Sequence, residues 1–235
     1  MNNNNIKCDI VLTSPPYNVS HHNKSDKYAY RYGKYDDTLT NEEYINKTIN
    51  LFNQLDKVLN KNGVILYNLS YSVNQPSLYL TTIANIISQT NFELVDTIVW
   101  KKTKCLPDNR SKNRLSRIVE FIFVLVRKNE AKSFTSNKQL ISTAKSGANN
   151  YNPIYNFIEA RNNDENTSLN KANYSSELCL KLLNMYGKEG MIIYDPFMGT
   201  GTTAIAALKY NCKFIGSEID EHQVEYANKR METSS

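Results

Sequence analysis

Short apolar runs alternate along the chain with longer segments in which apolar residues recur every three or four positions. We predict β-strands for the apolar runs at 8–12, 64–69, 94–100, 120–126, 191–194 and 213–217. We predict helices for the periodic segments at 41–59, 76–89, 176–186, 204–210 and 221–231, the first capped by Thr40 or Asn41. Strands that alternate with helices predict an α/β sandwich around a mostly parallel sheet.

Two polar stretches interrupt this alternation. A Tyr- and Lys-rich stretch ending at Asp37 predicts a long loop, and 127–173 is rich in Asn, Ser and Lys with weak periodicity. We therefore expect the second stretch to form a small inserted region rather than core.

Composition excludes several classes of protein. No apolar run approaches the ~18 residues of a membrane span and no signal peptide opens the chain, so we expect a cytoplasmic protein. The 4 cysteines form no C-x-x-C pair and the 3 histidines show no metal-ligand spacing, so we expect neither disulfides nor a metal site. A net charge of +5 leaves nucleic-acid binding open.

A glycine turn follows the predicted strand at 191–194, in the order Asp195-Pro196-Phe197-Met198-Gly199-Thr200-Gly201-Thr202-Thr203. A ligand can approach the backbone closely at Gly199 and Gly201, and the following helix offers free N–H groups. Taken alone, the turn could simply begin a helix. Ala204 occupies the third glycine slot of G-x-G-x-x-G, a variant that leaves NAD open on spacing alone.

Glu218 ends the next predicted strand, where a carboxylate can accept hydrogen bonds from both ribose hydroxyls. Alone it would be an ordinary solvated carboxylate. Together with the glycine turn it favours a ligand that contains adenosine.

A second turn, Ser14-Pro15-Pro16-Tyr17, follows the predicted strand at 8–12. Consecutive prolines make its backbone rigid. The Ser14 hydroxyl and the Pro15 carbonyl could both accept hydrogen bonds from an amino group, and Tyr17 could stack on the ring that carries it. Without other motifs this would be an ordinary Pro-Pro loop.

The two turns in this order resemble the β-class S-adenosylmethionine-dependent DNA amino-methyltransferases, and the resemblance covers nearly the whole chain. It implies one Rossmann-like domain whose mostly parallel sheet contains an antiparallel hairpin. Residues 8–127 would form the catalytic half, 170–231 the cofactor half and 128–169 a target-recognition insert. The family's third strand has no counterpart, so we expect a missing edge strand, or cover from Met1–Lys7 or a partner subunit, and hence a homodimer.

The resemblance also assigns residues. The catalytic residues would be Ser14, Pro15, Pro16 and Tyr17. The cofactor S-adenosyl-L-methionine would contact Asp195, Pro196, Phe197, Gly199, Gly201, Thr202, Glu218 and Asn170, the last in a slot where the family usually has His. Double-stranded DNA would be held by the cations between two predicted strands, namely Lys101, Lys102, Arg110, Lys112, Arg114 and Arg117, and by Lys24, Lys27, Arg31 and Lys34.

The implied reaction is methyl transfer to the exocyclic amino nitrogen of a base flipped out of the duplex. Ser14 occupies the slot where adenine-modifying relatives usually have Asp or Asn, so we predict cytosine N4. Adenine N6 is the alternative, followed by a catalytically silent nucleic-acid-binding subunit. Methylation of RNA or of a protein glutamine ranks lower, because those enzymes generally have the opposite motif order. A cognate restriction endonuclease is an expected partner.

Overall fold

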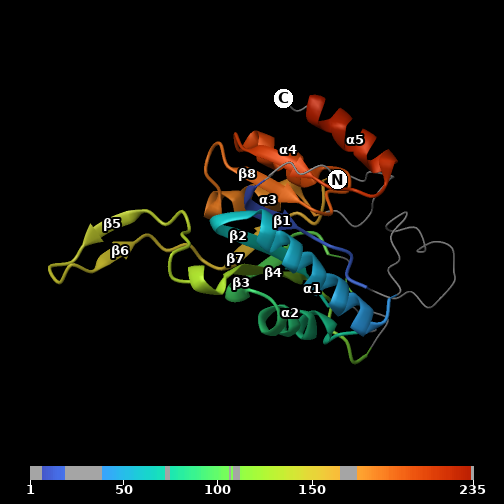
Figure 1. The fold of residues 1–235 in the computed structure, drawn as a ribbon, viewed down its shortest axis with the longest axis horizontal. Coiled ribbons are helices and arrows are strands. Elements are labelled where there is room, and N and C mark those ends of the chain that lie inside the picture. The colour runs from blue at the N-terminus through green and yellow to red at the C-terminus, as the bar shows by residue number, and fades with distance from the viewer. Residues whose placement is uncertain are drawn as a thin grey trace.

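The computed structural model describes residues 7–18, 39–71, 75–105, 107, 112–164 and 174–233. The strands are β1 (Cys8–Thr13), β2 (Leu59–Leu69), β3 (Phe92–Lys102), β4 (Val119–Arg127), β5 (Leu140–Thr143), β6 (Asn149–Tyr151), β7 (Phe157–Ala160), β8 (Ile192–Asp195) and β9 (Lys213–Gly216). The helices are α1 (Asn41–Val58), α2 (Leu78–Gln89), α3 (Ser176–Tyr186), α4 (Thr202–Lys209) and α5 (Glu221–Glu232), shown in Figure 1.

Seven of the described strands form one sheet in the order β7-β3-β4-β2-β1-β8-β9, and β5 and β6 pair separately. Strand β4 runs antiparallel to both β2 and β3, and the other neighbouring strands pair in parallel. The predicted fold class is confirmed, including the antiparallel hairpin, which β3 and β4 form.

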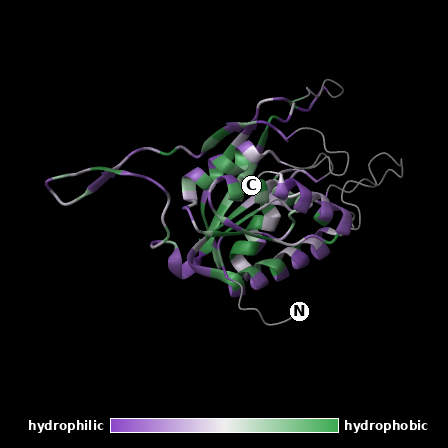
Figure 2. Cartoon of the chain, turned by 90° about the horizontal axis from the view of Figure 1, so that it is seen from above, coloured by the Kyte–Doolittle hydropathy of each residue, from purple (hydrophilic) through white to green (hydrophobic). Residues whose placement is uncertain are grey.

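Alternate residues of the central strands bury their side chains on opposite faces of the sheet. In β2, Leu66 joins the core beneath α3 and α4, whereas Ile65 and Tyr67 join the core beneath α1 and α2. In β4, Val124 and Leu125 divide between the two cores in the same way. A strand covered on both faces reads as a continuous apolar run, which explains why these strands were clear in the sequence. Figure 2 shows the apolar strands enclosed by helices with polar outer faces.

Helix α1 begins with a capping box. The Glu43 N–H donates to the Thr40 hydroxyl at 3.2 Å, and the Thr40 N–H donates to the Glu43 carboxylate at 2.9 Å. Of the two predicted caps the structure therefore selects Thr40. The box fixes where the chain enters α1 and thus anchors the end of the segment that follows the Ser14 turn.

The predicted insert at 128–169 divides into parts with different positions. Strands β5 and β6 form a separate two-stranded arm, whereas β7 pairs with β3 and extends the main sheet. Ile158 and Ala160 of β7 are buried in the core, so this part differs from the expected inserted region. The sequence could not reveal β7, because four residues are too few to show a period.

The arm leaves the sheet at the edge opposite the Ser14 turn. Because β4 is antiparallel, it carries the chain away from that turn, and the arm extends outward from there (Figures 1 and 2). At its base, the Asn137 N–H donates to the Met185 carbonyl at 2.8 Å near the end of α3. The role of 128–169 in target recognition remains a prediction, and the arm itself lies far from the turn.

At the other side of the sheet, β9 is the last strand among the described residues. Lys7, the one described residue of the Met1–Lys7 segment, does not lie beside β9. Its ammonium group donates to the Lys57 carbonyl at 2.6 Å, near the end of α1. The rest of that segment lies outside the described residues, as does most of the predicted loop that ends at Asp37.

Arg127, at the end of β4, holds the junction between α1 and β2. Its guanidinium group donates to the Asp56 carboxylate at 2.5 Å and to the carbonyls of Asp56 and Leu59, both at 2.7 Å. The side chain is only 13% exposed. The carbonyls at the end of α1 therefore accept their hydrogen bonds from a side chain of β4.

We predict that Arg127→Met lowers the free energy of unfolding by about 3 kcal/mol, because buried oxygens lose a charged donor. Urea unfolding followed by circular dichroism measures this change. Lys132→Met, at an exposed position nearby, serves as the control and should shift stability by less than about 0.5 kcal/mol. Equal stability of the two variants would contradict the anchoring role of Arg127.

Candidate active site

The two turns singled out in the sequence lie side by side at one edge of the sheet. Strands β1 and β8 are parallel neighbours, with Val11 opposite Tyr194, so both strands end at the same edge. The Ser14 turn follows β1 and the glycine turn follows β8. The carboxyl ends of adjacent parallel strands form the usual ligand-binding crevice of open α/β sheets.

The carboxylate of Asp195 joins these two turns. One of its oxygens accepts from the Thr13 hydroxyl at 2.6 Å and from the Phe197 N–H at 3.0 Å. The other accepts from the Thr203 hydroxyl at 2.5 Å and the Tyr174 hydroxyl at 3.2 Å. The residue is 2% exposed, so the carboxylate lies beneath the glycine turn and ties it to β1, to α4 and to the segment before α3.

Burial raises the pKa of the Asp195 carboxyl, and the hydrogen bonds from Thr13, Thr203, the Phe197 N–H and Tyr174 act in the opposite direction. Burial and the neighbouring Asp195 raise the pKa of the Tyr174 phenol well above its usual range. Tyr174 therefore stays protonated and remains a donor.

The glycine turn needs its glycines for backbone geometry. Gly199 and Gly201 have φ values of 50° and 80°, in the left-handed region that favours glycine. A Cβ at Gly201 would lie 2.9 Å from the Cβ of Ala227, so the missing side chain lets α5 pack against the start of α4. The Arg230 guanidinium of α5 donates to the Thr200 carbonyl at 2.7 Å and holds the turn from outside.

Glu218 lies against the same turn. One carboxylate oxygen accepts from the Gly199 N–H at 2.9 Å, and the other accepts from the N–H groups of Ile219 and Asp220 at 2.8 and 3.0 Å. The structure thus brings Glu218 next to the glycine turn, and its contact with a ribose remains a prediction. Pro196 and Phe197 belong to the same turn. Thr202 follows the turn directly and is the first residue of α4.

The Ser14 turn is fixed by contacts from three elements. Pro15 and Pro16 are buried, and the Tyr44 hydroxyl of α1 donates to the Pro16 carbonyl at 3.0 Å. The Ser14 and Tyr17 hydroxyls are 3.0 Å apart. Tyr17 in turn contacts a side chain on β2 and another on β4, which sequence analysis did not assign to the site.

Those two side chains are Asn68 and Glu120. The Tyr17 hydroxyl lies 2.9 Å from the Asn68 amide oxygen and 3.1 Å from a Glu120 carboxylate oxygen. The other Glu120 oxygen forms an ion pair with Lys102. A polar side chain within the apolar strand 64–69 was a visible signal for Asn68. The contact with Glu120 depends on strand register, which the sequence does not reveal.

The predicted DNA-binding cations differ in their surroundings. Lys102 pairs with Glu120, Lys101 pairs with Glu159 at 3.2 Å, and Arg117 donates to the Tyr71 carbonyl at 3.2 Å. Lys112 and Arg114 are exposed. Other predicted site residues lie outside the described residues, namely Arg110, Asn170, Lys24, Lys27, Arg31 and Lys34.

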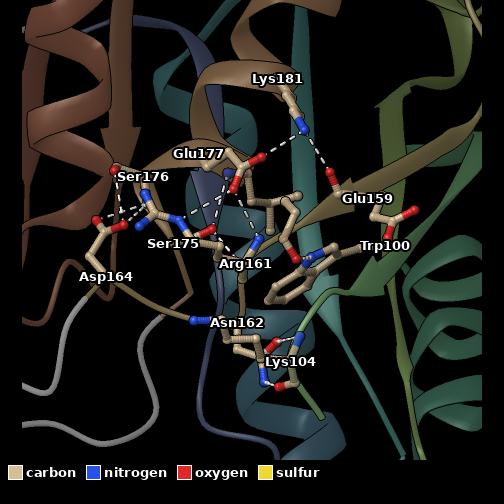
Figure 3. Close-up of polar contacts among 12 residues, drawn as sticks. Trp100, Lys104, Glu159, Arg161, Asn162, Asp164, Ser175, Ser176, Glu177 and Lys181 are labelled. Atoms are coloured by element: carbon tan, nitrogen blue, oxygen red, sulfur yellow. Dashed lines mark hydrogen bonds and ion pairs between the residues drawn. The ribbon is translucent and has the colours of Figure 1, made fainter.

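Residues 161–164, which follow β7, contact the start of α3 (Figure 3). Asp164 caps α3 by accepting from the Ser176 N–H at 2.9 Å and from its hydroxyl at 3.0 Å. The Arg230 guanidinium, which holds the glycine turn, also lies 3.9 Å from the Asp164 carboxylate. Asp164, Tyr174 and Arg230 thus support the site from a distance, and none of them is among the predicted site residues.

Within the described residues, no helix is long and apolar enough to cross a membrane, and no cluster of His, Cys, Asp and Glu could hold a metal ion.

Comparison with known proteins places this geometry in context. The family model described as DNA methylase, for N6 and N4 methylation, matches residues 8–229. The type II methyltransferase M.BglII of Bacillus subtilis is 24% identical over 238 residues, which cover 93% of this chain. The chain spans 62% of the length of that relative.

Two solved structures share the fold. The PvuII DNA methyltransferase, described as cytosine-N4-specific, matches with a TM-score of 0.70 at 17% identity, over 96% of this chain and 80% of that one. A complex of M1.HpyAVI with SAM matches with a TM-score of 0.65 at 22% identity, over 97% of this chain and 90% of that one. Because the family model matches nearly the whole chain, the protein belongs to the N6/N4 DNA methylase family.

Proposed function

We propose that this protein transfers a methyl group from S-adenosyl-L-methionine to an exocyclic amino nitrogen in DNA, and that this nitrogen is N4 of cytosine. The observation that carries the proposal is the junction at Asp195, which holds the Ser14 turn and the glycine turn at adjacent positions. A methyl donor in one turn and a target amine in the other would thus be neighbours. Family membership supports DNA as the substrate, and the M1.HpyAVI complex supports the cofactor.

The target nitrogen is a poor nucleophile, because its lone pair is delocalised into the aromatic ring. Hydrogen bonds from the amino group to the Ser14 hydroxyl and the Pro15 carbonyl would favour tetrahedral geometry and restore that lone pair. The cofactor would supply an electrophilic methyl group bonded to sulfur. The lone pair would form the N–C bond as the C–S bond breaks, the electrons of that bond would leave with the sulfur, and the nitrogen would lose one proton to solvent. Positioning supplies most of the effect.

The cofactor would lie across the glycine turn. Pro196, Phe197, Gly199, Gly201 and Thr202 would contact its methionine end. Glu218 would accept hydrogen bonds from the ribose hydroxyls, and its carboxylate would then share its lone pairs with the backbone donors that it already binds. Asp195, which the resemblance assigned to the cofactor, is buried beneath the turn, so we propose that it acts by holding the turn in shape.

The target base would leave the duplex to reach the Ser14 turn. Unstacking costs a few kcal/mol, which a stack on Tyr17, worth roughly 1–3 kcal/mol, would offset in part. Among the predicted cations, Lys112 and Arg114 are exposed, and we propose that they contact DNA phosphates. A homodimer and a cognate restriction endonuclease remain expected partners.

Incubation with S-adenosylmethionine and DNA should yield N4-methylcytosine, because the first slot of the catalytic turn holds Ser14. Hydrolysis of the DNA and mass spectrometry of the nucleosides identify the product. N6-methyladenine as the only product would contradict the cytosine assignment. Cofactor binding by calorimetry without any methylated nucleoside would instead favour a silent DNA-binding subunit.

Ser14→Ala should lower kcat by about a hundredfold, because a hydrogen-bond acceptor for the amino group is lost. Cofactor affinity should stay within twofold of the wild type, since Ser14 belongs to the other turn. Steady-state kinetics and calorimetry measure the two effects. Ser133→Ala is a matched control at an exposed site far from the turn. A parallel loss of cofactor affinity would place Ser14 in the cofactor site instead.

Glu218→Ala should weaken cofactor binding by about tenfold and change kcat at saturating cofactor much less, because the ribose contact is the same in the ground and transition states. Calorimetric titration with S-adenosylmethionine gives the affinity. Glu221→Ala, at an exposed position in the first turn of α5, is the control. Unchanged affinity in a folded Glu218 variant would remove the ribose assignment.

A further inference from the structure

The proposed chemistry needs Ser14 to accept a hydrogen bond, yet a serine hydroxyl can donate as readily as it accepts. A hydroxyl that donated its proton toward the target nitrogen would engage the lone pair that must attack the methyl group. The direction of the hydrogen bond at Ser14 therefore matters as much as its presence. The contacts around Tyr17 determine that direction.

Tyr17 links Ser14 to two groups that can only accept. The Asn68 amide N–H donates to the Phe121 carbonyl at 3.1 Å, which leaves the Asn68 amide oxygen facing Tyr17 at 2.9 Å. The carboxylate of Glu120, ion-paired with Lys102, faces the same hydroxyl at 3.1 Å. Neither oxygen can donate a proton to Tyr17.

A phenol hydroxyl carries one proton. If the Tyr17 proton pointed to Ser14, the lone pairs of Tyr17 would face the oxygens of Asn68 and Glu120 without any proton between them. The proton therefore points toward Asn68 and Glu120, and the 3.0 Å contact with Ser14 is made by the Ser14 proton. This arrangement leaves the lone pairs of the Ser14 oxygen for an incoming amino group.

We infer that Asn68 and Glu120 are positioning residues that act through Tyr17 to hold Ser14 as a hydrogen-bond acceptor. The inference rests on the proposed methyl transfer and deepens it. The β2–β4 pairing, in which Asn68 lies opposite Ile122, brings both residues to the Ser14 turn.

Lys102 completes the arrangement. The Glu120 and Lys102 side chains are 14% and 22% exposed, and the Lys102 ammonium lies 5.2 Å from the centre of the Trp100 ring. A carboxylate with so little solvent needs a cationic partner to stay charged. We therefore assign Lys102 to Glu120 rather than to a DNA phosphate.

Glu120→Gln tests the inference with little change in volume. A glutamine amide can donate to the Tyr17 oxygen, so only the Asn68 amide oxygen still draws the Tyr17 proton away from Ser14. We expect kcat to fall by about tenfold, with cofactor affinity unchanged. Glu159→Gln removes a more exposed Glu–Lys pair, between β7 and Lys101 of β3, without touching Tyr17, and it should keep the wild-type kcat.

A double-mutant cycle separates this role from a merely structural one. Tyr17→Phe keeps the ring but removes the hydroxyl that connects Ser14 to Glu120. In that background Glu120→Gln should cause no further loss of kcat, because the chain of hydrogen bonds is already broken. Losses that multiply would overturn the inference.

A second background covers the case in which Tyr17→Phe is too slow to measure. Ser14→Asp supplies a carboxylate, which accepts a hydrogen bond regardless of where the Tyr17 proton points. In this background Glu120→Gln should therefore lower kcat by less than twofold. A tenfold cost in that background would also overturn the inference. Wild-type protein that transfers no methyl group would instead overturn the proposed function, and with it this role for Glu120.

Discussion

The buried carboxylate of Asp195 is the interaction on which the arrangement of the site depends. A carboxylate this deeply buried is stable only when its lone pairs are well satisfied, and here the donors come from β1, from the glycine turn, from α4 and from the segment before α3. Each donor belongs to a different part of the chain. The two chemically important turns therefore hold their spacing through one shared acceptor rather than through a flexible connection.

Around this junction the polar contacts form two layers. Glu218, Thr200 and Arg230 determine the shape of the glycine turn, and Tyr44 and Tyr17 determine the shape of the Ser14 turn. Arg230 and Tyr44 reach these turns from helices, and they lie 30 and 28 residues from their partners in sequence. A site assembled in this way stays rigid without a ligand, which suits a reaction that relies on positioning.

Much of this fold could be predicted from hydrophobic pattern, but not all of it. Helix α3 was predicted with its observed bounds, because its apolar positions keep a helical period throughout. Strand β2 was predicted at 64–69, whereas it begins at Leu59 and includes the pair Asn62-Gly63, which is typical of turns. Asn62 has a φ of 59°, so the turn-like residues occur inside the strand as a local irregularity.

The site was predictable to the extent that its residues occur in contiguous motifs. Ser14 and the glycine turn are visible because several informative residues stand next to one another. Asn68, Glu120 and Tyr174 act through contacts that span long sequence separations and depend on register, which no local pattern encodes. Strand β7 was missed for a related reason, since its stability comes from pairing with β3 rather than from its own composition.

The position of the β5–β6 arm has a practical consequence for work with this protein. The arm projects from the edge opposite the two turns, and its strands end as a pair, with Thr143 opposite Asn149. The intervening turn is exposed, and a Cβ at Gly147 would meet nothing within 4 Å. A reporter domain or affinity tag could be inserted there, because chain ends held close together tolerate an insertion without strain on the rest of the sheet.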